Sequence, residues 1–262
     1  MDLIQYVDHP PGPDQKVQAT SARLEFGGPA ANAAFTSVCL GVACQLVTAV
    51  GSSPLGRIAA QQIEDAGVEL MDAVVDDWAI PVSSVAVSSA GRSVISVNGG
   101  QPPRLEMGVC LTGFDALLVD GHHLPLCLAM AYEARTLGVP VLLDGGSWKP
   151  GLERLLPLVD AAVISADFRG ELPEIPVAVT RGAGPIEFRC AAGSGSVTVH
   201  EVTPADTLGA GDVFHGAWLA HVAQHGLDNF RAGLSFAAEV ASFSCQYPGA
   251  HAWAAPYRST LQ

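Results

Sequence analysis

The sequence has little positive charge. Its 262 residues include 13 Lys and Arg against 26 Asp and Glu, which gives a formal net charge of −13 at pH 7. A protein that binds a polyanion needs Lys and Arg clustered on one face. We therefore expect no nucleic-acid partner, although backbone amides and single arginines can still hold a small anionic substrate.

The sequence also lacks a long apolar segment and a secretory leader. No apolar run reaches the length that crosses a bilayer. The first five residues contain no basic stretch followed by an apolar one. We therefore expect a soluble, cytoplasmic protein with no membrane partner.

Paired cysteines are missing as well. The six cysteines are scattered and form no C-x-x-C motif, which is typical of reduced core cysteines in a cytoplasmic protein. The His122-His123 pair stands far from any pair of cysteines, so we expect no structural metal.

What the sequence does have is an alternation of short apolar runs with helical patterns from Gly113 onward. This alternation is typical of a parallel sheet covered by helices, an open α/β sandwich, and the length suits one main domain over residues 1–262. The expected strands are 45–50, 116–119, 139–143, 161–164 and 177–180. The expected helices are 30–40, 55–66, 125–137, 152–158, 212–225 and 229–246.

Two segments, 16–26 and 82–98, do not fit the sandwich. In the second, polar and apolar residues alternate around Gly91, which predicts a hairpin that is exposed on one face. Arg92 and Asn98 lie on it, and a long cation or an amide there could reach a phosphate, sulfonate, carboxylate or hydroxyl of a substrate. Ordinary solvated residues of an edge hairpin are the alternative.

The most informative segment is Asp206-Thr207-Leu208-Gly209-Ala210-Gly211-Asp212, which runs into an apolar helix. A helix start has unpaired amides and a positive dipole end that attract phosphate oxygens. Gly209 and Gly211 let an anion approach those amides closely. Asp212, beside the phosphate, is suited to accept a proton from an attacking alcohol. An acidic residue at the start of an ordinary helix is the alternative.

This segment resembles the D-T-x-G-A-G-D signature of the ribokinase-like, or PfkB, carbohydrate kinases, with every fixed letter present. The resemblance implies a three-layer α/β/α sandwich with a mostly parallel sheet and a small β lid formed by 16–26 and 82–98. It also implies that Asp212 is the catalytic base and that Gly209, Ala210 and Gly211 form an anion hole. Asp206 would lie by the monovalent cation and the metal-phosphate region.

A second glycine-to-helix junction, Gly27-Gly28-Pro29-Ala30-Ala31-Asn32, has no basic residue and suits a neutral polyol. It resembles the family's G-G-x-x-x-N substrate motif, which implies that Gly27, Gly28 and Asn32 bind sugar. Asp2 matches an Asp that bonds sugar hydroxyls in the family, where it usually follows an apolar strand. We expect that the natural product begins earlier than the numbered chain; a sheet lacking that strand is the alternative, and a frayed terminus is the alternative role for Asp2.

The segment from Val177 to Gly184 is expected to be a buried strand that runs into a glycine turn, which is where ligands bind in an open α/β sheet. It resembles the family's T-x-G-x-x-G segment, which implies that Thr180, Arg181, Gly182 and Gly184 line the ATP site. A plain hairpin turn is the alternative. The segments 143–148, 165–167 and 213–216 resemble ketohexokinase-like and sulfofructose kinase-like members. Asp144, at a strand end, either contacts substrate or metal-bound water or caps a turn.

The expected function is an ATP-dependent transfer of the γ-phosphoryl group to a primary hydroxyl of a sugar or sugar derivative, with a ketose favoured. Nucleoside kinase and a non-catalytic sugar or nucleotide sensor are the alternatives. The expected cofactors are ATP, Mg²⁺ and a monovalent cation such as K⁺. The lid hairpin could also pair with a second copy to form a homodimer.

Overall fold

The computed structural model describes residues 1–97, 102–106, 108 and 110–260. Its internal contacts divide the chain into two compact units. The first contains residues 1–31 and 45–106, and the second contains 32–44 and 107–262. Helix α1 (Pro29–Cys39) begins in the first unit and continues in the second.

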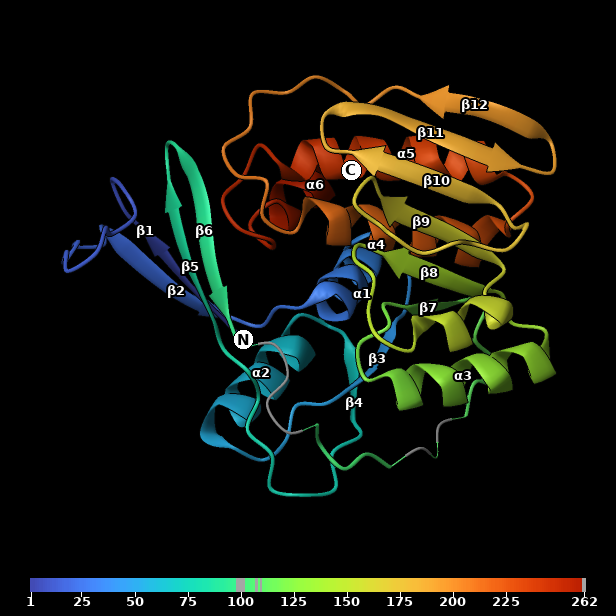
Figure 1. Cartoon of the computed structure of the whole chain (residues 1–262), viewed down its shortest axis with the longest axis horizontal. Helices are drawn as coiled ribbons and strands as arrows, with labels where there is room; N and C mark the ends of the chain where they lie inside the picture. Colours follow the sequence, from blue (N-terminus) through green and yellow to red (C-terminus); the bar gives the residue numbers. More distant parts are fainter. Residues whose placement is uncertain (98–101, 107, 109, 261–262) are drawn as a thin grey trace. The chain divides into compact units, whose positions relative to one another are not determined.

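The second unit is built on a six-stranded sheet in the order β12-β11-β10-β9-β8-β7 (Figure 1). The four strands from β7 to β10 are parallel, and β11 and β12 continue the sheet as antiparallel strands. Strand β8 is buried along its whole length because its Val-Leu-Leu run is apolar toward both faces, as in a sheet covered on two sides. The bounds are β7 (Leu117–Val119), β8 (Val141–Gly145), β9 (Ala161–Ser165), β10 (Val177–Arg181), β11 (Gly184–Cys190) and β12 (Gly193–Val197).

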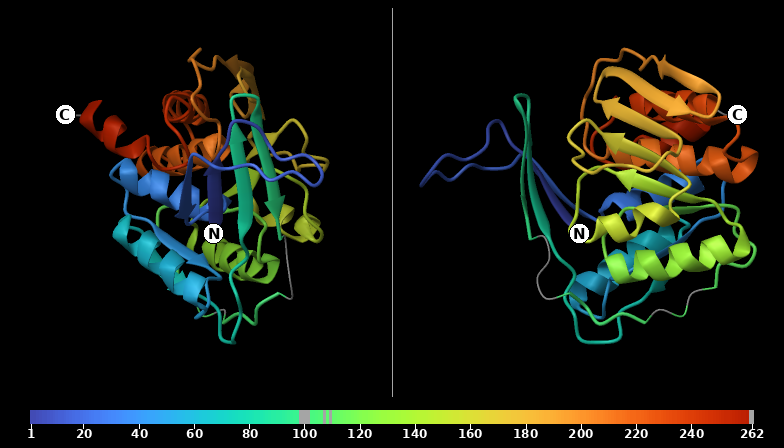
Figure 2. Two further views of the ribbon diagram at one scale, coloured as in Figure 1. Left: turned by 90° about the vertical axis from the view of Figure 1, so that its left-hand side faces the viewer. Right: turned by 45° about the vertical axis from the view of Figure 1, so that its right-hand side comes forward.

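Helices cover both faces of this sheet. Helix α3 (Leu124–Leu137) packs against β7 and β8, whereas α4 (Ala210–His225) and α5 (Phe230–Ser244) pack on each other, and α5 contacts β12. Figures 1 and 2 show α3 on one face and the pair α4 and α5 on the other. A short helix, α6 (Ala254–Thr260), ends the described chain. The predicted three-layer α/β/α sandwich with a mostly parallel sheet is confirmed in this unit.

Helices α1 and α4 cross at very close range. A Cβ atom added at Gly216 would lie 2.3 Å from the carbonyl oxygen of Ala33 and 2.7 Å from the Cβ of Thr36. The Ser37 hydroxyl donates to the Gly216 carbonyl at 2.9 Å. Glycine is required at this crossing, and the crossing fixes the start of α4 beside Asn32.

The first unit contains two small sheets (Figures 1 and 2). The larger has the order β2-β1-β5-β6, in which β1 and β5 are parallel and the other pairs antiparallel. The smaller pairs β3 with β4 in parallel, and α2 packs against β4. The bounds are β1 (Asp2–Tyr6), β2 (Ser21–Glu25), β3 (Gln45–Thr48), α2 (Pro54–Asp65), β4 (Glu69–Asp72), β5 (Ser83–Ser88) and β6 (Gly91–Ser96).

The local structure differs from the predicted elements in several places; β4 and α6, for example, were not predicted. The segment expected to be one helix over 152–158 forms two 3-10 turns, η1 (Leu152–Arg154) and η2 (Leu156–Leu158), because Pro157 has no N–H to donate to a continuous α-helix. Residues 16–20 are not in a strand. Strand β12 was not predicted, since its Gly-Ser-Gly-Ser-Val sequence has almost no apolar side chains to reveal it.

The cysteines, the exposed face of β6 and the length of the helices bear on further expectations from the sequence. Of the six cysteines, only Cys39 and Cys127 are buried, so the interpretation as core cysteines is wrong for the exposed Cys110. Strand β6 exposes Val94 and Ile95, and the homodimer through this hairpin stays a prediction. No helix among the described residues is long and apolar enough to span a membrane.

Candidate active site at the start of helix α4

The helix α4 begins without a side-chain cap. Its N-cap is Gly209, which has φ 75° and no side chain that could bond the first-turn amides. Gly211 is exposed, and a Cβ atom added to it would meet nothing within 4 Å. The Ala210 amide donates to the Thr207 carbonyl at 3.3 Å. The helix start therefore has open space beside Gly211, whereas the Ala210 amide is already bonded, and the anion-hole role of Gly209, Ala210 and Gly211 stays a prediction.

Asp206 braces the loop that leads into α4. Its Oδ1 accepts from the Leu208 amide and its Oδ2 from the Gly249 amide, each at 2.9 Å. The amides of Ala205 and Asp206 both donate to the Cys245 carbonyl. Asp206 therefore fastens the loop to the segment that follows α5. Within the described residues, no three or more His, Cys, Asp or Glu side chains are grouped to hold a metal ion, and the metal role of Asp206 stays a prediction.

Asn32 and Asp212, which belong to separate motifs, form a direct contact. Asn32 Nδ2 donates to Asp212 Oδ2 at 2.7 Å across 180 residues of sequence. On its other side, Asn32 Oδ1 lies 2.9 Å from His251 Nε2, so the imidazole is the donor there. Because both ends of its amide are engaged, Asn32 is held with its N–H groups toward Asp212.

The surroundings of Asp212 favour its protonated form. Burial of the carboxyl, and next the neighbouring Asp144 carboxylate, raise the pKa of Asp212 from 3.8 to about 7. The hydrogen bond from Asn32 and the nearby His215 act in the opposite direction, and Asp120 adds a smaller increase. A carboxyl with a pKa near the working pH is well suited to accept a proton in a reaction.

Sequence reasoning missed three residues of this cluster: Asp120, His215 and His251. Asp120 follows β7, as Asp144 ends β8, and ligands of parallel α/β sheets gather at the carboxyl ends of strands. That rule could have identified Asp120. His215 could have been singled out as a polar residue inside an otherwise apolar helix, one turn after Asp212.

The first unit brings together part of the predicted sugar motif. A Cβ atom added at Gly27 would lie 2.0 Å from Asp2 Oδ2, so only glycine allows this carboxylate to approach the backbone. Gly28 has φ 102°, a conformation that favours glycine. Arg92 is exposed on β6, and Asn98 lies outside the described residues.

The predicted nucleotide segment forms a hairpin. Strand β10 ends at Arg181, β11 begins at Gly184, and Gly182 has φ 60° in the turn between them. The Arg181 guanidinium pairs with Glu187 at 2.7 Å on the exposed side of the hairpin. Thr180 Oγ1 donates to the Ile164 carbonyl at 3.3 Å. The alternative of a hairpin turn is therefore present, and the ATP-binding role of these residues stays a prediction.

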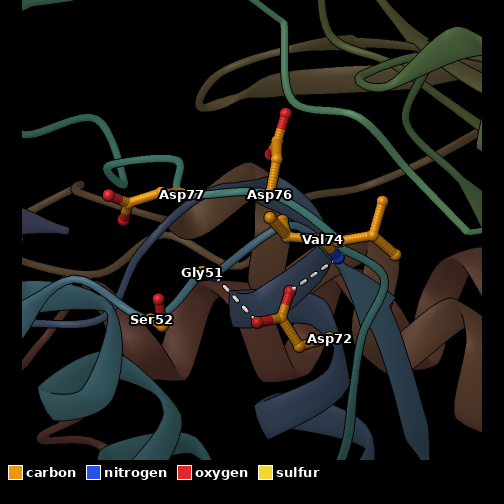
Figure 3. A pocket seen from close by; sticks show the side chains of 7 residues that line it. Gly51, Ser52, Asp72, Val74, Asp76 and Asp77 are labelled. Carbon is orange, nitrogen blue, oxygen red and sulfur yellow. Dashed lines mark hydrogen bonds between the residues drawn. The ribbon is translucent and has the colours of Figure 1, made fainter.

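A hollow in the first unit contains none of the predicted residues. It is lined by Gly51, Ser52, Asp72, Val74, Val75, Asp76 and Asp77 (Figure 3). The Asp72 carboxylate accepts from the amides of Val50, Gly51 and Val74 at 2.8–3.1 Å. Asp72 therefore serves to hold the turns that follow β3 and β4.

With this geometry established, comparison with known proteins identifies the family. The profile described as pfkB family carbohydrate kinase matches residues 1–167 and 171–256, nearly the whole chain. The chain belongs to the pfkB family of carbohydrate kinases. The resemblance that rested on the motif from Asp206 to Asp212 is confirmed, and with it the expected enzyme class; the narrower resemblance to ketohexokinase-like members stays a prediction.

Relatives of this pfkB-family chain are distant in sequence and close in fold. An ATP-dependent ribose-1-phosphate kinase of Halopiger xanaduensis is 26% identical over 239 residues, which cover 84% of this chain and 80% of the relative. The crystal structure of a candidate ribokinase from Agrobacterium tumefaciens matches with a TM-score of 0.85 at 23% identity, over 99% and 93% of the two chains. A candidate ribokinase II from E. coli, in complex with ATP and Mg²⁺, matches with a TM-score of 0.75 at 18% identity, over 99% and 95%.

Proposed function

We propose that this pfkB-family chain transfers the γ-phosphoryl group of ATP to a primary hydroxyl of a sugar or sugar derivative, with a ketose preferred. The observation that carries the proposal is the placement of Asp212: a carboxyl with a pKa of about 7 in the first turn of a helix whose start has no side-chain cap. A base and an anion-binding helix start in one turn are what phosphoryl transfer to an alcohol requires.

Asp212 accepts the hydroxyl proton in this proposal, and the amides of Gly209, Ala210 and Gly211 stabilise the transferring phosphoryl oxygens. Asn32, held between His251 and Asp212, donates to the base and is placed to contact the acceptor hydroxyl. Asp2, Gly27 and Gly28 contribute to holding the sugar, and Arg92 and Asn98 reach its outer groups from a lid over residues 16–26 and 82–98. The whole chain acts as a single kinase domain.

For the nucleotide, the uncapped start of α4 and the open space at Gly211 fit phosphate groups. Thr180, Arg181, Gly182 and Gly184 line the nucleotide site in this proposal. Mg²⁺, when bound with ATP, neutralises charge on the phosphates, and it is usually held by one or two carboxylates plus those phosphates. Each oxygen of Asp206 keeps a lone pair beyond its amide bond, which suits a neighbouring monovalent cation such as K⁺.

An acceptor panel tests the proposal. Turnover of ATP is measured by coupled ADP release with ketoses, aldoses including ribose, ribose 1-phosphate, sugar acids, sugar sulfonates and nucleosides, with K⁺ and with Na⁺. We expect turnover with at least one sugar-type acceptor and the highest kcat/KM with a ketose. Preference for a nucleoside would replace the sugar assignment by nucleoside kinase. Binding of sugar and ATP without turnover across the panel would favour a sensor.

The activity should depend on pH through Asp212. The base works only when ionised, and its pKa is raised to about 7, so kcat/KM should rise as the pH rises through about 7. Below that value, each pH unit should lower kcat/KM about tenfold. The measurement is kcat/KM for the best acceptor between about pH 5.5 and 9. A profile that stays flat down to pH 5.5 would contradict the assignment.

A further inference from the structure

His215 lies one turn after Asp212 on α4, in surroundings that offer its ring only acceptors. The side chains of His215 and Asp144 are each 7% exposed. His215 Nδ1 lies 2.7 Å from the Gly211 carbonyl oxygen and 3.3 Å from Asp144 Oδ2. His215 Nε2 lies 3.1 Å from the Val163 carbonyl oxygen. Two of these oxygens are backbone carbonyl oxygens and the third belongs to a carboxylate when Asp144 is ionised, and none of the three then has a proton to donate.

A neutral imidazole cannot satisfy this set of partners. It has one N–H and one lone pair. With the proton on Nδ1, the lone pair of Nε2 would face the Val163 carbonyl. With the proton on Nε2, the lone pair of Nδ1 would face both the Asp144 carboxylate and the Gly211 carbonyl. Each arrangement leaves a buried acceptor pointing at an acceptor, which costs free energy. An imidazolium donates at both nitrogens and satisfies all three oxygens.

The charges around Asp212 also bear on the protonation of His215. Asp144 and Asp120 raise the pKa of Asp212, and the nearby His215 lowers it. The Lys149 ammonium donates to the Asp120 backbone carbonyl at 2.8 Å. Asn32, which donates to Asp212, is neutral. If His215 is charged, Asp144 is one member of an ion pair, and His215 partly compensates its effect on Asp212. If His215 is neutral, Asp144 is an uncompensated anion beside Asp212, which disfavours ionisation of the Asp212 carboxyl.

We propose that His215 is a positioning residue that is held as an imidazolium by Asp144, Gly211 and Val163, and that this charge favours the ionised form of the base Asp212 over its protonated form. The catalytic meaning of the proposal rests on the proposed function. The protonation of His215 and its effect on Asp212 do not, and both can be measured without turnover.

The first test is nuclear magnetic resonance of the full chain labelled with ¹⁵N-histidine, in which the His215 signals are assigned by their loss in His215→Asn. We expect both ring nitrogens to carry protons between about pH 6 and 8. A ring with one protonated nitrogen at about pH 7.5 would overturn the proposal, whether or not the chain is an active kinase.

The second test follows the ionisation of Asp212 by ¹³C-carboxyl signals, assigned by their loss in Asp212→Asn. In His215→Asn the carboxamide can still donate toward Asp144 and Gly211 but carries no charge, so the Asp212 titration should move up by about one pH unit. In Asp144→Asn/His215→Asn both charges are gone, and the titration should return toward that of the wild type. An unchanged Asp212 titration in the single variant would overturn the proposal. His215→Gln replaces His215→Asn if the latter fails to fold.

The third test measures by kinetics whether His215 affects catalysis through Asp212. The acid limb of the pH profile, where kcat/KM falls with falling pH, should shift with the Asp212 titration. At a pH below the acid limbs of both enzymes, kcat/KM of His215→Asn should therefore be about tenfold lower than that of the wild type, and at high pH the two should be equal. His225→Asn, at the exposed end of the same helix, is the matched control and should leave the limb in place. A uniform loss at all pH values would indicate a structural role and would contradict the proposal. Absence of turnover in the wild type would refute the proposed function alone.

Discussion

Replacing Asp212 by Asn is expected to abolish nearly all turnover and to leave nucleotide binding intact. The amide is nearly isosteric and can still accept the hydrogen bond from Asn32 Nδ2, but it cannot take a proton from the acceptor hydroxyl. General-base catalysis contributes on the order of 10² to 10⁴ in rate, so kcat should fall by at least about 100-fold. Coupled ADP release measures turnover, and calorimetric titration measures binding of an ATP analogue.

Asp228→Asn is the control for this variant. Asp228 is exposed and lies between α4 and α5, so its replacement removes one negative charge from the chain without touching the cluster. It should keep wild-type turnover. Thermal unfolding should show both variants folded. An Asp212→Asn enzyme with more than about a tenth of the wild-type kcat would show that another group is the base.

The sandwich could be predicted from the sequence because its strands are buried on both faces. Runs such as Val141 to Leu143 and Ala161 to Val163 are apolar at every position, and segments with a helical apolar pattern alternate with such runs along the chain. The segments that escaped prediction lack this signal. Strand β12 is mostly Gly and Ser, and the stretch over 152–158 has the apolar pattern of a helix, but Pro157 interrupts its hydrogen bonds.

The motifs of the candidate site could be predicted, but the electrostatics that join them could not. Asp212 and Asn32 each stand in a recognisable glycine-containing segment. Their contact across 180 residues arises from the crossing of α1 and α4, and the orientation of Asn32 by His251 depends on the segment that follows α5. The same holds for the pKa of Asp212, which depends on Asp144 at the end of β8 and on His215. Hydrophobic periodicity says nothing about which polar groups meet at the ends of elements.

The two glycines within α4 are expected to respond in opposite ways to a single methyl group. In Gly211→Ala the new Cβ meets nothing within 4 Å, so stability should be kept or raised by up to about 1 kcal/mol. The methyl group would stand where the proposed phosphoryl group approaches, and kcat/KM should fall at least about tenfold. In Gly216→Ala the new Cβ falls 2.3 Å from the Ala33 carbonyl oxygen, and the backbone of α1 or α4 must shift.

Overpacking of this kind costs about 1–3 kcal/mol, more than the about 1 kcal/mol that alanine gains over glycine in a helix. Gly216→Ala should therefore lower Tm by several degrees in thermal unfolding. Gly233→Ala in α5 is the matched control, because the nearest atoms to its new Cβ are side-chain atoms, His221 Cδ2 at 2.9 Å and Trp218 Cδ1 at 3.3 Å, and not backbone. It should cost less than Gly216→Ala. If Gly211→Ala instead lost stability and kept its activity, the glycine would serve the fold of the helix start and not the binding of an anion.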